Sequence, residues 1–363
     1  MPANFDLSNL ALKALAPNNE ILYDDKGLPS IMVKIPKMTY AQLGLGASTA
    51  IHPAFIVNGQ EVDAIYISKY QNIVQDGRAY SLPGEDPKAN INFDTALAAC
   101  TAKGAGWHLM TRAEWAVLAL WCKNNGTMPK GNNNYGKDNA DSIYQAIPSM
   151  ARDSSNRIQR VATGTGPLSW SHDGTPSGIW DLNGNVNEWV GGIRTVYGEL
   201  QILANNNAAD KDKSQAANSA QWMAIKASDG TLITPSGDGR TTGSIRLTWG
   251  SSIWTWTDAA PAEDTTYHGC DFEAIACSAN ISNDAKALLQ ALGLFKYDAT
   301  VGAYAGDKFY ADVTQAERSF CCGGNWGYAG GAGVFCSYGN LGRTVTYDVG
   351  LGFRSAFVEL PSA

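Results

Sequence analysis

The spacing of apolar residues predicts two main helices in the first half of the chain. Residues 92–103 place an apolar residue every three to four positions, with Asn92 as a plausible N-cap, which is typical of a helix with one buried face. Residues 113–124 repeat this spacing, and Thr111 stands three residues before Glu114, the pattern of a capping box. We expect both helices to belong to the core scaffold.

Other segments predict short strands and two short helices. Residues 6–15 and 284–292 predict helices, the second stopped by Gly293. Residues 31–36 predict a strand that ends at a proline, and residues 249–256, where Trp alternates with small polar residues, predict another. The turn signal Asn58-Gly59 predicts a hairpin between residues 55–57 and 64–70. The expected fold class is therefore α+β, loop-rich, with short strands and two main helices.

Composition removes several classes of protein. Hydrophobic residues make up 44% and charged residues 17% of the 363 positions, whereas a disordered chain needs low hydrophobicity. The net charge is −7 and no Lys/Arg cluster stands out, so nucleic acid is not expected as a partner. No apolar run reaches the ~18 residues of a membrane span, so membrane insertion is not expected either. Residues 1–13 show no secretory signal.

Three motifs, in this order and at this spacing, resemble the formylglycine-generating enzyme (FGE)-sulfatase branch of the C-type lectin fold. They are residues 106–115 (GWHLMTRAEW), residues 180–189 (WDLNGNVNEW), and Gly323-Gly324-Asn325-Trp326 followed by Arg343 and 350–354 (GLGFR). The resemblance covers most of residues 55–357, with a long insertion at about 195–318. It assigns scaffold roles to Trp180, Asp181, Gly184, Asn185, Glu188, Trp189, Gly323, Gly324, Trp326, Arg343, Gly352, Phe353 and Arg354.

Elementary chemistry agrees with these roles. Asp181, Asn183 and Asn185 favour turns, because their side chains bond to nearby backbone and tolerate positive φ. We expect Arg354 to be a buried guanidinium that pairs with a carboxylate such as Glu188. The same oxygen-bearing residues raise a second interpretation, a structural calcium ion, which needs several clustered oxygen ligands. The turn interpretation is favoured, and no cofactor or metal site is assigned.

The enzymes of this family hold copper with two cysteines five positions apart near the C-terminus. That segment of this chain contains one candidate, Cys336, while Cys321 and Cys322 are adjacent and lie before the glycine pair. Soft metals require convergent thiolates, so an oxidase is the weaker hypothesis. The seven cysteines are scattered, and without a secretion signal we expect Cys270 and Cys277 to be free thiols.

The C-terminal pattern resembles more closely the variable proteins of diversity-generating retroelements. In those systems a reverse transcriptase miscopies adenines of a template, so that Asn codons scatter over fixed positions. Randomising the first two bases of an Asn codon cannot give Lys, Glu, Gln, Met or Trp, and none of these occurs in residues 327–348. Within the expected variable region, about residues 320–356, the resemblance implies binding positions at Gly327, Tyr328, Gly331, Cys336, Tyr338, Gly339, Gly342, Val345, Tyr347 and Asp348.

These expectations combine into a ligand-binding protein that is not an enzyme. Tyr328, Tyr338 and Tyr347 are the expected anchors, because tyrosine supplies large contact area at low entropy cost. The expected ligand is a protein or carbohydrate on a host or cell surface. We expect residues 1–50 to attach the binding domain, residues 51–363, to a virion such as a phage tail or to a cell surface. A fixed lectin-like virion module is the third hypothesis.

Overall fold

The computed structural model describes residues 6–260, 267–346 and 349–361. Within those ranges the α-helices are α1 (Leu7–Leu15), α2 (Phe93–Thr101), α3 (Arg112–Asn125) and α4 (Asn283–Ala291). All four helices predicted from the sequence are present. The prediction that two of them dominate is only half right, because α3 has 14 residues whereas α1, α2 and α4 have 9 each.

Side-chain caps fix the helix ends that the sequence indicated. The hydroxyl of Thr111 accepts a bond from the backbone N–H of Glu114, and the Glu114 carboxylate accepts one from the Thr111 N–H. This reciprocal capping box satisfies two donors that a helix start leaves unpaired. At the other end of α3, Gly126 has φ +69°, a left-handed conformation that glycine adopts without a Cβ penalty. Asn92 caps α2 through its side chain.

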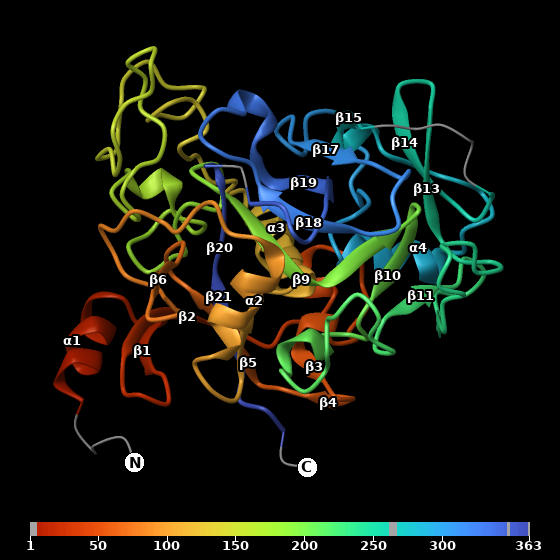
Figure 1. Cartoon of the computed structure of the whole chain (residues 1–363), viewed down its shortest axis with the longest axis horizontal. Coiled ribbons are helices and arrows are strands. Elements are labelled where there is room, and N and C mark those ends of the chain that lie inside the picture. The colour runs from red at the N-terminus through yellow and green to blue at the C-terminus, as the bar shows by residue number, and fades with distance from the viewer. Residues whose placement is uncertain (1–5, 261–266, 347–348, 362–363) are drawn as a thin grey trace.

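A five-stranded sheet forms the lower part of the molecule in Figure 1 and contains both early and late segments of the chain. Its order is β1 (Asn19–Tyr23), β2 (Pro29–Pro36), β5 (Ala64–Ser68), β21 (Ser355–Phe357) and β8 (Trp107–Leu109). The predicted strand at residues 31–36 is therefore confirmed. Residues 1–50, expected as a leader, contribute β1 and β2 to this sheet and are hydrogen-bonded to the domain that they precede.

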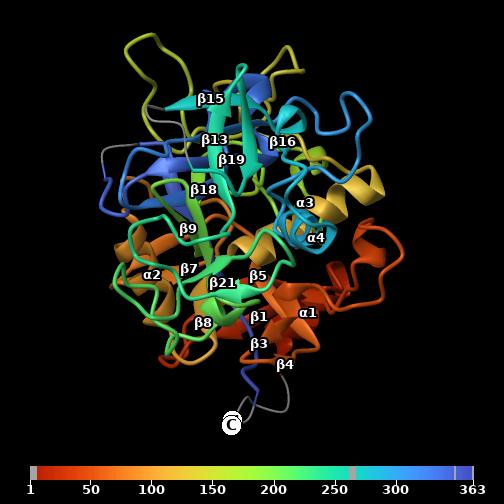
Figure 2. The ribbon, with the colours of Figure 1, turned by 90° about the vertical axis from the view of Figure 1, so that its right-hand side faces the viewer.

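A larger, twelve-stranded sheet fills the upper part. Its main path runs β15 (His268–Asp271), β17 (Lys308–Ala311), β19 (Gly333–Leu341), β18 (Arg318–Gly323), β9 (Asn187–Val196), β10 (Glu199–Ile202), β13 (Arg246–Gly250), β14 (Ile253–Thr257) and β16 (Ala276–Cys277). Beside that path lie β11 (Met223–Ile225), β12 (Leu232–Ile233) and β20 (Leu351–Phe353). The expected insertion, residues 195–318, thus adds strands to both edges of one sheet, as Figure 2 shows from the side of β13 and β14.

Two strand predictions require correction. The Asn58-Gly59 turn does form a hairpin, but β3 (Ile56–Val57) pairs with β4 (Gln60–Glu61), while β5 pairs with β2 and β21. The two-residue turn selects the immediately following residues as partners, and the apolar strand is buried elsewhere. The segment 249–256 is the tip of the β13–β14 hairpin, with a turn at Ser251 and Ser252, rather than one strand. The remaining hairpin joins β6 (Ile73–Gln75) to β7 (Arg78–Tyr80).

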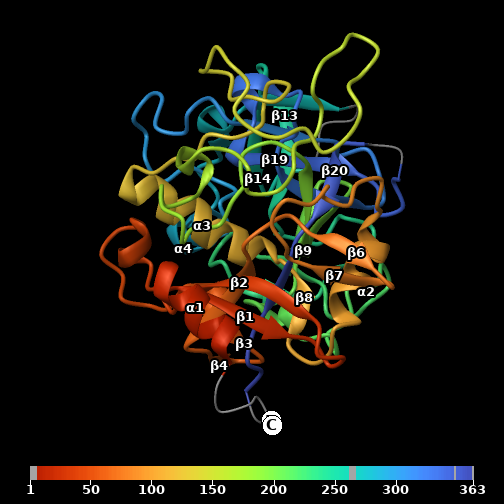
Figure 3. The ribbon, with the colours of Figure 1, turned by 90° about the vertical axis from the view of Figure 1, so that its left-hand side faces the viewer.

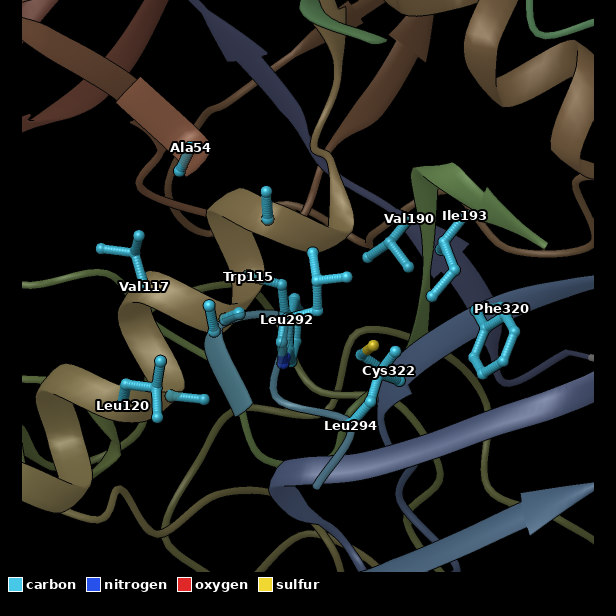
Figure 4. Close-up of a cluster of buried hydrophobic side chains, with 14 of the residues drawn as sticks. Ala54, Trp115, Val117, Leu120, Val190, Ile193, Leu292, Leu294, Phe320 and Cys322 are labelled. Carbon is cyan, nitrogen blue, oxygen red and sulfur yellow. The ribbon is translucent and has the colours of Figure 1, made fainter. Parts of the chain in front are cut away.

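The main core lies between α3 and the two sheets. Figure 4 shows Trp115 and Val117 of α3 near Leu292, with Val190 of β9 and Cys322 of β18 on the far side. The indole N–H of Trp115 donates to the carbonyl of Val334 at 2.7 Å, so the helix is attached to the start of β19. No helix in the described ranges combines the length and the apolar character needed to cross a membrane.

Candidate binding face

A buried ion pair connects two of the recognised motifs. Arg354 donates from Nε to Glu188 Oε2 at 2.5 Å and from Nη2 to Glu188 Oε1 at 2.6 Å. The remaining guanidinium donors reach the carbonyls of Ser68 and Trp180, and both charged side chains are buried. The expected pairing is confirmed. Because each charge is fully hydrogen-bonded, removal of one partner leaves the other unpaired in the core.

The turn before β9 is built from the residues that the sequence indicated. Asp181 and Asn185 have φ values of +63° and +62°, the left-handed region that Asp and Asn tolerate best. The Asn185 amide bonds to Asn132, to Gln71, and to both backbone groups of Val161. Burial raises the pKa of Asp181 to about 6. The turn interpretation is therefore confirmed.

The same hydrogen bonds bear on the calcium interpretation. The carboxamide oxygens of Asn183 and Asn185 accept bonds from protein N–H groups, which is the role that the turn interpretation gives them. Across the described ranges, no group of three or more His, Cys, Asp or Glu side chains is placed to hold a metal ion.

Arg343 fixes the far end of the segment that we expected to vary. Its guanidinium donates to Glu317 at 2.7 Å, to Asp94 at 2.8 Å and to the carbonyl of Gln215. Its own carbonyl accepts a bond from the N–H of Phe93, the first residue of α2. At the near end, the half-buried ring of Trp326 packs on Tyr135 with 5.3 Å between ring centroids. Both predicted scaffold residues therefore tie the segment to distant parts of the chain.

Tight packing explains the frame glycines. Gly323, Gly324 and Gly184 have φ of +91°, +75° and +80°. A Cβ on Gly184 would lie 2.2 Å from the Asn132 carbonyl oxygen, and one on Gly352 would lie 2.7 Å from the Lys88 carbonyl oxygen. Trp189 and Phe353 are fully buried in one cluster. We call the thirteen predicted scaffold residues the frame.

Five of the ten predicted binding positions lie on the surface. Gly327 is exposed, and the other four are half-buried: Tyr328, Gly331, Gly342 and Val345. They lie in the turn that contains the short helix η6 (Ala329–Gly331) and in the segment after β19. A Cβ on Gly327 or Gly342 would have no heavy atom closer than 3.6 Å, so these positions have room for a methyl group. The turn lies at the top of the molecule in Figures 1 and 3.

Three other predicted positions are buried in β19 and correct the expectation of a continuous surface segment. Cys336 is fully buried, Tyr338 is 7% exposed, and a Cβ on Gly339 would lie 2.6 Å from the Phe320 ring. The reason is that β19 pairs with β17 on one side and β18 on the other, so it is a central strand rather than a loop. Tyr347 and Asp348 lie outside the described residues.

Four tyrosines form a row that the sequence only partly indicated. Tyr338 stacks on Tyr310 at 4.2 Å between ring centroids and also contacts Tyr328 at 5.0 Å. Tyr310 in turn stacks on Tyr267 at 5.5 Å, with the two rings only 5° from parallel. We call these residues the tyrosine row. Tyr310 and Tyr267 belong to the expected insertion, and the sequence analysis missed them. The strand pattern of residues 308–311 could have indicated a strand at Tyr310, but it could not have shown that this strand pairs with β19.

The cysteines do not form the site of a copper oxidase. All seven are free thiols, as expected for Cys270 and Cys277. Burial raises the pKa of Cys336 well above that of an ordinary thiol, which opposes formation of the thiolate that a soft metal requires. Leu341 occupies the position five residues later. The thiol of Cys322 instead accepts a bond from Arg112, a buried guanidinium that also donates to Ser337 and to two carbonyls after α4.

Comparison with known proteins places the chain in a family. The FGE-sulfatase family, described as "Sulfatase-modifying factor enzyme 1-like domain", matches residues 52–238, a little over half of the chain. Among solved structures, Treponema denticola variable protein 1 is similar at 12% identity and a TM-score of 0.33, over 95% of this chain and all of that one. PvdO from Pseudomonas aeruginosa is similar at 12% identity and a TM-score of 0.30, over 94% and 98%. No curated protein sequence matches.

The family match includes two of the three motifs recognised in the sequence, and the structure joins the third to them through the Arg354–Glu188 pair. It extends past Thr195, the expected start of the insertion, as far as residue 238. Together with the mixed helices and short strands, it confirms the predicted α+β fold class. This chain belongs to the sulfatase-modifying factor enzyme 1-like (FGE-sulfatase) family and has the C-type lectin fold of that subtype.

Proposed function

We propose that this protein binds a ligand through residues 327–346 and that a retroelement diversifies this surface. The observation that carries the proposal is that the C-terminal segment contains two kinds of position, buried or tied frame residues and surface residues. Frame residues at both ends are buried or tied by charged hydrogen bonds, whereas Gly327, Tyr328, Gly331, Gly342 and Val345 lie at the surface. Side chains can change at such positions at little cost to folding, which a diversified surface on a rigid scaffold requires.

The same geometry favours binding over catalysis. The one cysteine that occupies the expected region, Cys336, is enclosed in the core with a raised pKa. In its place the surface offers tyrosine and small residues, a composition shared with antibody paratopes. The ligand is a molecule on a host or cell surface, and its side chains or sugars would meet this face directly.

The position of α1 supports attachment through the N-terminal region. Leu7, Leu10 and Leu15 of α1 are 74%, 54% and 82% exposed, so the described part of the chain leaves these apolar side chains uncovered. In Figure 1, α1 lies in the lower part of the molecule, and the turn with η6 lies at the top. Contact with a virion or cell envelope through α1 would therefore leave the variable face directed outward.

Sequencing the 3′ end of the gene in a population that carries it tests the proposal. We expect the codons of residues 327, 328, 331, 342 and 345 to vary, and the codons of Glu188, Gly352 and Arg354 to stay constant. A downstream near-copy that differs at adenines, beside a reverse-transcriptase gene, is the second expected finding. A uniform sequence over residues 327–348 with no such copy would reject diversification and leave a fixed binding module.

Localisation is tested separately with an antibody against the purified chain. Expected labelling is on particles or on the outer cell surface, and replacement of Leu7 and Leu15 by Ser should release the chain from either. Labelling confined to the cell interior would reject the proposed display.

A further inference from the structure

The tyrosine row joins the variable segment to the insertion. Tyr328 and Tyr338 come from the predicted binding positions, whereas Tyr310 lies in β17 and Tyr267 immediately precedes β15. The parallel pairing of β17 with β19 sets Tyr310 directly opposite Tyr338, and the rings stack. Half of the row therefore comes from residues that a retroelement copying only the 3′ end would leave unchanged.

The insertion holds its half of the row firmly. Gly269 faces Tyr310 across the β15–β17 pair, and a Cβ there would lie 2.3 Å from the Tyr310 ring. One edge of the ring thus packs against Gly269, while its faces stack on Tyr267 and Tyr338. Preorganised aromatic side chains lose little entropy on binding. Tyr267 remains 48% exposed at the end of the row.

The arrangement of the rings distinguishes two classes of ligand. Each inner ring, Tyr310 and Tyr338, contacts two neighbouring rings, so its faces are not open for stacking against a sugar. The two inner rings therefore offer edges and hydroxyl groups, whereas the end ring, Tyr267, stacks on Tyr310 alone. Burial raises the pKa of Tyr267 to about 12, and its hydroxyl therefore remains a hydrogen-bond donor at neutral pH. Apolar edges beside hydroxyl donors suit the mixed carbonyl and apolar surface of a polypeptide.

We infer that Tyr267 and Tyr310 form a constant half of the binding face and that the ligand they contact is a polypeptide. This inference rests on the proposed function, because it adds fixed contacts to the same variable face. It explains how a binding protein can change residues such as Gly327 and Tyr328 and still retain affinity for one class of ligand: two anchors are always present.

Peptide selection tests the inference. Random peptides displayed on filamentous phage are selected on the full chain, and an enriched peptide is then titrated against variants by fluorescence anisotropy. Tyr328→Ala reports on the variable half, and Tyr267→Ala reports on the constant half. Tyr297→Ala is the matched control, because Tyr297 is 49% exposed and lies outside the row. We expect both row variants to weaken binding about tenfold, a typical hot-spot effect, and the control to bind like the parent.

The possible outcomes separate the two proposals. If Tyr328→Ala weakens binding and Tyr267→Ala binds like the control, the constant half is wrong and the proposed function stands. If neither row variant changes the affinity, both fail. Enrichment of no peptide, together with binding on a glycan array, would overturn the polypeptide class. Thermal melting checks that each variant folds, and Tyr310→Phe, which keeps the ring and removes one hydroxyl, gives a second measure should Tyr267→Ala unfold.

Discussion

The frame and the segment proposed to vary are neighbours in the chain, yet their glycines have different surroundings. Glycine shows the difference most directly. Gly352 of the frame has a carbonyl oxygen 2.7 Å from the position of a Cβ, whereas Gly342 of the variable segment has nothing closer than 3.7 Å. The same residue type is a packing requirement in one place and an open position in the other. Sequence composition cannot show this distinction, because it depends on what lies opposite each residue.

The largest expected effect comes from breaking the buried ion pair of the frame. Glu188→Gln removes the carboxylate charge and leaves the Arg354 guanidinium unpaired in the core, which we expect to destabilise the fold by about 3–5 kcal/mol. Urea unfolding followed by tryptophan fluorescence measures the loss. Asp153→Asn, which removes the partner of the surface residue Arg157, is the control and should unfold like the parent. Equal urea midpoints for the two variants would show that the Glu188–Arg354 pair does not stabilise the fold.

A methyl group added to a frame glycine should have the next largest effect. Gly352→Ala forces a Cβ against the Lys88 carbonyl and the Val186 side chain, and overpacking of this kind costs about 1–3 kcal/mol. The melting temperature should fall accordingly in a thermal scan at neutral pH. An unchanged melting temperature would mean that β20 has room to move away from β9, and the contrast with Gly342 would disappear.

A pH titration should separate the core at the start of α3 from the tyrosine row. His108 bonds through one ring nitrogen to the Gly106 carbonyl and through the other to the Glu114 carboxylate, each at 2.8 Å. Burial lowers its pKa, but Glu114 and the two acceptors outweigh this, and the pKa is raised above 6.5. A raised folded-state pKa means that the stabilisation is complete below pH 6.5 and is lost as the pH rises through the raised value.

The measurement is the free energy of unfolding between pH 5 and 9, compared with that of His108→Gln. We expect the parent to lose stability as the pH rises through the raised pKa of His108, and the variant to lose less. Tyr267 should not contribute, because burial raises its pKa to about 12. Parallel curves for parent and variant would show that His108 is neutral in the fold.

The smallest effect belongs to the variable segment. Gly327→Ala and Gly342→Ala place a methyl group in open space, and we expect each to change stability by less than about 0.5 kcal/mol, as for other surface substitutions. Chemical denaturation measures the free energy of unfolding of both variants, which is then compared with that of Gly352→Ala. A loss as large as that of the frame variant would mean that the segment is not free to vary, and the proposed diversification would lose its structural basis.

Gly339 and Cys336 are two predicted binding positions that the structure places in the core. Both lie among the predicted binding positions, yet Gly339 is packed against Phe320 and Cys336 is fully buried. In their environment they resemble the frame. The surface proposed to vary would therefore consist of the turn before β19 and the segment after it, because the strand between them forms part of the core.

Local signals in the sequence determined much of this protein. The capping box at Thr111, the left-handed turn at Asn185 and the four helices follow from side chains that act on backbone a few residues away. The family followed from three motifs in order, and the expected pairing of Arg354 with a carboxylate such as Glu188 is present in the structure. Tertiary structure alone decided which strand each segment joins. Pairing of β17 with β19 spans a loop whose course no local pattern specifies, and that pairing buries Cys336, stacks Tyr310 on Tyr338 and so decides which side chains a ligand can reach.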